Sequence, residues 1–146
     1  MGVALGGVIG LVPDRSQTER IVGFLAGFGL AWIGFAVRAA VLPDTSLARA
    51  IVVFMMILAA MGISTASASR LPLWSLLVGA AAMVGAYEQT YADTPSLFAT
   101  ESPTAATTVL LAAAMGVLGT MLLGEEVTAR RVAEREDARI YSEVFV

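Results

Sequence analysis

Hydrophobic residues form four long runs that are separated by short polar connections. The runs cover about residues 19–42, 47–68, 72–91 and 103–124. Each run is about 20 residues long, which is the length that an α-helix needs to cross roughly 30 Å of hydrocarbon. The pattern therefore predicts an all-α integral membrane protein, in which four transmembrane helices form an up-down bundle.

The polar connections carry helix-start signals. Ser16 and Glu19 match a capping box, and Thr45 lies among good N-cap residues before the second run. Ser102 followed by Pro103 predicts that the last helix begins at the end of an exposed loop from Glu88 to Ser102. These signals place the predicted helix starts next to the hydrophobic runs.

The segment before the first helix covers residues 1–15. Residues 1–12 are apolar, and residues 13–15 are predicted to form a turn. Residues 1–12 would form a helix only about 18 Å long, which is too short to span a bilayer. Gly2, Gly6 and Gly10 recur every four residues and would line one face of such a helix. Two interpretations follow: an oligomerisation face or half-inserted segment, or, as the simpler expectation, a flexible Gly-rich end lying in the membrane interface.

The composition changes after Gly124. Residues 125–139 are rich in charge and contain neither Gly nor Pro, and Glu126 and Arg130 are spaced for an i,i+4 pair. We therefore expect the last helix to continue out of the membrane as a charged helical tail, residues 125–146. Its end is apolar again, which indicates either contact with a partner or a frayed terminus.

Small residues recur at spacings of three or four along three of the predicted helices. In a membrane such stripes mark the faces where helix backbones approach each other. The predicted helix-packing residues are Gly23, Gly27, Ala31, Gly34, Gly79, Gly85, Ala112, Gly116, Thr120 and Gly124.

The composition excludes a water-soluble domain. Hydrophobic residues make up 58% of the 146 residues and charged residues only 14%, whereas soluble domains carry about 25% charged residues. The chain contains neither Cys nor His, which removes thiolate and imidazole as metal ligands, haem ligands and catalytic groups. We therefore expect no enzyme activity, no cofactor, no metal site and no nucleic-acid partner.

The basic residues are all Arg, and most lie on one predicted side. That usage points to a GC-rich genome and a prokaryotic cell membrane or a derived one. Arg15, Arg20, Arg70 and the tail arginines would lie inside, against Arg38 and Arg49 outside. The positive-inside rule then places both termini in the cytoplasm.

Polar and aromatic residues near the helix ends provide few candidate functional sites. Arg38 and Glu88 face the same predicted side, so they are either an interface ion pair or two separate anchors. Tyr87 and Tyr91 are expected in the aromatic belt. Ser64, Thr65 and Ser67 form either a polar lining or a closely packed helix end.

Two functions remain consistent with these patterns. The first is a non-catalytic structural or accessory subunit of a larger membrane assembly, which contacts lipid and other subunits or copies of itself through helix packing. The alternative is a small homo-oligomeric channel or carrier lined by the hydroxyl residues above. The number of small-residue stripes favours the first.

Overall fold

The computed structural model describes residues 2–12, 16–41 and 45–144, with side-chain surroundings up to residue 122. This part of the chain is helical, contains no strand and thus has the predicted all-α fold class. Its elements are α1 (Gly2–Leu11), α2 (Gln17–Val41), α3 (Ser46–Ala66), α4 (Leu73–Asp93), the 3₁₀ turn η1 (Pro95–Leu97) and α5 (Phe98–Val144).

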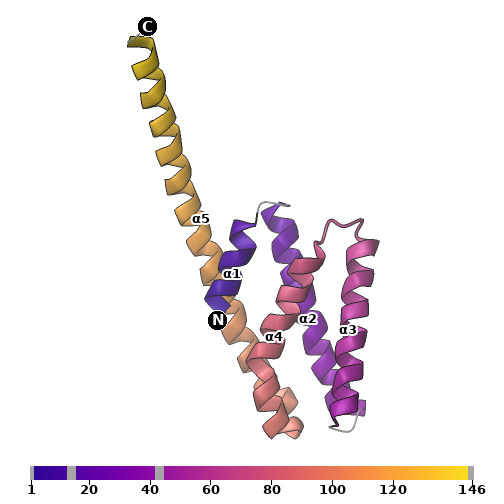
Figure 1. Cartoon of the computed structure of the whole chain (residues 1–146). Helices are drawn as coiled ribbons and strands as arrows, with labels where there is room; N and C mark the ends of the chain where they lie inside the picture. Colours follow the sequence, from indigo (N-terminus) through magenta and orange to yellow (C-terminus); the bar gives the residue numbers. More distant parts are fainter. Residues whose placement is uncertain (1, 13–15, 42–44, 145–146) are drawn as a thin grey trace.

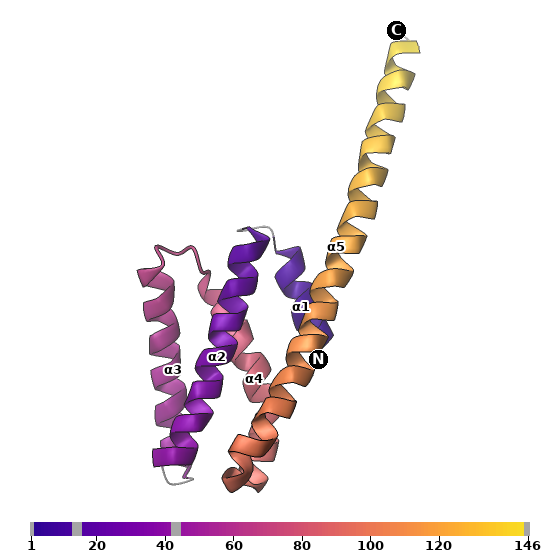
Figure 2. The same ribbon diagram turned by 180° about the vertical axis from the view of Figure 1, so that it is seen from behind.

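Helices α2 and α4 cross at the centre of the bundle. Helix α3 lies on one side of this pair, and α1 and α5 lie on the other (Figures 1 and 2). The α1–α2 and α3–α4 connections share one end of the bundle, toward which the C-terminal part of α5 also points. The α2–α3 connection and the α4–α5 junction share the opposite end.

Among the residues that the structure describes, three segments are long and apolar enough to cross a membrane: Gln17–Val41, Ser46–Ala66 and Pro95–Leu122. The predicted count of four is not confirmed, because α4 falls outside this set. Its C-terminal part carries Glu88, Gln89 and Thr90, which lower its hydropathy. Helix α4 packs against α2, α3 and α5, and its buried residues include Leu76, Met83 and Tyr87.

The polar stretch before α5 differs from the exposed loop that the sequence predicts. Helix α4 continues to Asp93, η1 follows, and α5 begins at Phe98 instead of residue 103. Ser102 is therefore a fully buried residue inside α5, not an N-cap. Its hydroxyl accepts a hydrogen bond from Trp32 Nε1 at 3.1 Å, and this contact holds the extra helical turn against α2.

The predicted helix-start signals at α2 and α3 are confirmed. The Ser16 and Glu19 side chains bond to each other's backbone N–H groups at 3.3 Å, as in a capping box. Thr45 Oγ1 accepts a hydrogen bond from Ala48 N at 3.2 Å and caps α3. Both hydroxyls satisfy backbone N–H groups that have no acceptor within their own helix.

The N-terminal segment is a helix rather than a flexible end. Gly2 lies against Val109 and Ala112, which fall near the middle of the candidate span in α5. The other end of α1 is held by Arg20, whose Nη1 donates to the carbonyls of Gly10 and Val12. A guanidinium at a helix C-terminus satisfies terminal carbonyls and complements the helix dipole.

The prediction that the last helix continues past Gly124 is confirmed. Helix α5 is one element of 47 residues. At 1.5 Å per residue it is about 70 Å long, more than twice the hydrocarbon thickness. Figure 1 shows its C-terminal part extending alone beyond the other helices.

Candidate functional site

The contact between α2 and α4 is built on glycine. A Cβ on Gly27 would overlap the carbonyl of Leu76, and one on Gly79 would overlap the carbonyl of Phe24. Gly23 lies in the same way against the Ser75 side chain. The predicted small faces of these helices therefore pack on each other, backbone against backbone.

A second glycine contact joins α1 to α5. A Cβ on Gly6 would overlap the Ala113 carbonyl, and one on Gly116 would overlap the Val3 carbonyl. Gly10 lies against Thr120, and Gly2 against Ala112. The four-residue glycine spacing of the N-terminal segment thus matches the small face of α5.

The remaining predicted packing residues have different surroundings. Gly34 faces Met56 and Val52 of α3, and Ala31 is buried. Gly85 is exposed. Gly124 lies in α5 but beyond the residues whose surroundings the structure describes. Most of the stripes that suggested spare packing surface are therefore occupied inside the chain itself.

The hydroxyl residues at the end of α3 bond to their own neighbourhood. Ser64 Oγ donates to the Leu71 carbonyl at 3.0 Å, and Thr65 Oγ1 donates to the Met61 carbonyl at 3.0 Å. Ser67 Oγ donates to the Ser64 carbonyl and accepts from Leu71 N. The bonds of Ser64 and Ser67 to Leu71 hold the α3–α4 turn, in which Ala68 and Ser69 have φ of 51° and 58°. The Thr65 hydroxyl instead bonds back to carbonyls of its own helix.

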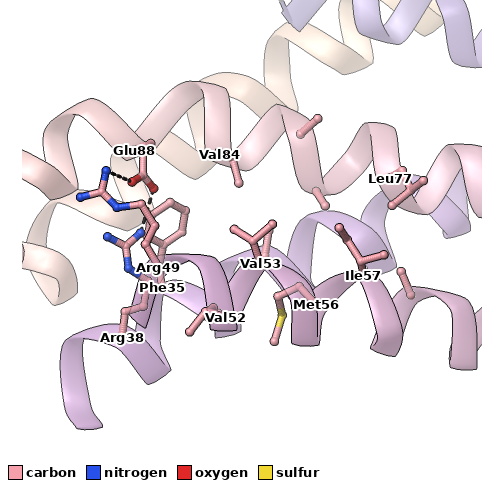
Figure 3. A pocket seen from close by; sticks show the side chains of 15 residues that line it. Phe35, Arg38, Arg49, Val52, Val53, Met56, Ile57, Leu77, Val84 and Glu88 are labelled. Atoms are coloured by element: carbon pink, nitrogen blue, oxygen red, sulfur yellow. Dashed lines mark hydrogen bonds and ion pairs between the residues drawn. The ribbon is translucent and has the colours of Figure 1, made fainter. Parts of the chain in front are cut away.

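A charged cluster lies at the opposite end of the bundle. Arg38 of α2 and Glu88 of α4 are paired, with Nη1 and Oε2 2.8 Å apart. Arg49 of α3 contacts the other oxygen of the same carboxylate at 3.3 Å. Three helices are thus joined through one carboxylate (Figure 3).

Aromatic rings enclose the Arg38 guanidinium. Its Cζ lies 4.4 Å from the ring centroid of Tyr91 and 5.4 Å from that of Phe35. Phe35 also packs edge-on against Tyr87 at 5.3 Å. Tyr87 and Tyr91 are almost completely buried inside the bundle near the C-terminal end of α4. Their rings support a cation that has only 7% of its side chain exposed.

An apolar groove of about 480 Å³ begins at this charged cluster and runs between α2, α3 and α4 (Figure 3). Small residues make room for it, and larger apolar side chains complete its walls. The lining consists of Ala31, Gly34, Phe35, Arg38, Arg49, Val52, Val53, Met56, Ile57, Ala60, Leu77, Ala80, Ala81, Val84 and Glu88. The groove has one charged end and a long apolar remainder.

The sequence indicated part of this site. The shared side of Arg38 and Glu88 suggested their pairing, and the structure brings them together. Sequence reasoning missed Arg49 as the third member, although its place in the first turn of α3 brings it to the same end. It also missed the groove, because a space between three helices depends on how they pack.

Comparison with protein-family models, curated proteins and solved structures finds no match for this chain. The arguments below therefore rest on its own residues and their contacts.

Proposed function

We propose that the chain is a non-catalytic accessory subunit of a larger membrane assembly, and that α5 carries the contact with its partner. The observation behind this proposal is the length of α5, which is 47 residues in one helix. The apolar part of this helix ends at about Gly124 in the sequence, and the helix continues through the charge-rich residues 125–144.

A single helix that leaves its bundle needs stabilisation from outside. In water most helical stability comes from packing an apolar face, and a helix that is polar all round needs ion pairs or a partner. Residues 125–139 are charged, and apolar residues such as Ile140, Val144 and Phe145 follow them. This sequence of charged and then apolar residues favours a helix that binds a partner protein. Charge pairs would stabilise the helix along its length, and its apolar end would contact the partner.

We further propose that α4 is the fourth membrane-spanning helix, and that the tail and the α3–α4 turn are cytoplasmic. Arg20 and Arg70 lie toward the same end of the bundle as the tail, whereas Arg38 and Arg49 lie at the opposite end. The tail contributes four further arginines. The resulting asymmetry follows the positive-inside rule.

The channel or carrier alternative has less support. Its proposed lining was Ser64, Thr65 and Ser67, whose hydroxyls already donate to nearby carbonyls. Thr108 and Thr120 also donate to carbonyls of their own helix. A path for a polar solute would require these groups to face it.

Native mass analysis after mild detergent extraction from the native membrane tests the proposal. The expected result is co-purification with unlike chains in a fixed ratio. A chain that ends after Gly124 should lose those partners while it still folds. A homo-oligomer without unlike chains would favour the channel alternative, and a monomer with an intact tail would contradict both proposals.

A further inference from the structure

The groove between α2, α3 and α4 is suited to an amphiphile. We propose that it binds one acyl chain of a membrane phospholipid, with the lipid phosphate at Arg49. This site is separate from the partner contact proposed for α5. The occupant would come from the leaflet on the side of the α2–α3 connection.

The apolar part of the groove fits a hydrocarbon chain. Leu77 and Glu88 mark its two ends along α4, about 16 Å apart at 1.5 Å per residue. That length matches one leaflet, which is half of roughly 30 Å of hydrocarbon. Lining residues such as Val53, Ile57 and Val84 are also partly exposed on the outer surface, so a lipid chain can enter sideways.

Small side chains keep this space open. Gly34, Ala60 and Ala81 belong to the lining and come from three different helices. An unfilled groove would deprive its walls of dispersion contacts, whereas an acyl chain from the surrounding bilayer supplies them. The bilayer is therefore the nearest source of an occupant of the right shape.

The charged end fits a phosphate. Guanidinium groups bind phosphate oxygens through paired N–H donors, and an arginine has five such donors. Arg49 lies at the mouth of the groove with 43% of its side chain exposed, and Glu88 holds Arg38 and Arg49 together (Figure 3). The Arg49 guanidinium thus lies where the headgroup of a lipid in the groove would lie, and the buried Arg38 adds positive charge behind it.

The test measures lipid binding to the full-length, delipidated chain in detergent by native mass spectrometry. The two probes are phosphatidylglycerol and a diacylglycerol with the same acyl chains. Arg49→Gln should weaken phosphatidylglycerol binding about tenfold, the effect of one or two charge-assisted hydrogen bonds, and leave diacylglycerol binding unchanged. Ala81→Phe places a ring in the groove and should weaken binding of both lipids.

Two matched variants control for general effects. Arg70→Gln removes an exposed arginine at the other end, and Ala114→Phe adds a ring on the exposed face of α5. Both should bind the two lipids as the parent chain does. The proposal is overturned if the parent retains neither lipid, if Ala81→Phe binds normally, or if Arg49→Gln weakens both lipids equally.

Discussion

Gly27 of α2 and Gly79 of α4 lie on facing helix surfaces, and each is pressed against the backbone of the other helix. No side chain separates the two helices at this crossing. The close packing of α2 on α4 therefore requires glycine, which has no Cβ, at two positions that are far apart in the sequence.

Gly27→Ala and Gly29→Ala form a matched pair that tests this crossing. The first places a methyl group on the Leu76 carbonyl, so the helices must separate, at a cost of about 1–3 kcal/mol for overpacking. The second adds a methyl group where no atom lies within 4 Å, and should gain up to about 1 kcal/mol of helix propensity. Thermal unfolding in detergent measures both. Equal melting temperatures for the two variants would contradict this account.

The shared carboxylate predicts an order of stability among three variants. Glu88→Gln removes the negative charge that Arg38 and Arg49 both contact, and should cost about 2 kcal/mol, between the values for buried and surface pairs. Arg38→Gln should cost at least as much, because that side chain is 7% exposed and stacked on Tyr91. Arg49→Gln should cost under about 1 kcal/mol. Denaturation in a fixed detergent ranks the three, and an Arg49 variant as unstable as the Glu88 variant would argue against this arrangement.

Membrane topology is testable directly because the chain contains no Cys. Ser69 and Thr94 flank α4, and both are exposed. If α4 crosses the membrane, Thr94→Cys reacts with an impermeant thiol reagent in intact cells, whereas Ser69→Cys and Ser142→Cys react only after permeabilisation. Labelling of Ser69→Cys and Thr94→Cys from the same side would show that α4 does not span.

Truncation after Arg139 tests the apolar end of the chain. The variant keeps the charged part of the helix and removes Ile140, Tyr141 and the five residues that follow. We expect it to insert and fold but to dissociate from its partner more readily during extraction, measured as loss of the native complex mass. Unchanged assembly and unchanged melting temperature would identify the end as a frayed terminus.

Helix positions and faces could be predicted from the sequence more readily than helix partners. Ser16, Glu19 and Thr45 marked helix starts because capping is a local interaction between residues three apart. The spacing of Gly23, Gly27 and Gly79 identified packing faces but not which face meets which, since that depends on the whole bundle. The place of Arg49 in the charged cluster could not be predicted either, because it also depends on how α3 packs against α2 and α4.

The start of α5 shows how a local signal can mislead. Ser102 followed by Pro103 has the form of a helix start, yet the helix begins at Phe98. The packing of the Phe98 ring on Trp32 and Tyr87, together with the Trp32–Ser102 hydrogen bond, stabilises the turn before the proline. Membrane helices tolerate an internal proline where neighbouring groups compensate for the missing bond.

The glycine contact between α1 and α5 constrains the order in which the helices can pack during biosynthesis. Helix α1 leaves the ribosome well before α5, yet its ten residues are too short to span a bilayer alone. Its glycine face fits a surface that does not exist until the last helix is made. The contact between α1 and α5 can therefore form only after α2, α3 and α4 have been synthesised, although α1 precedes all of them in the chain.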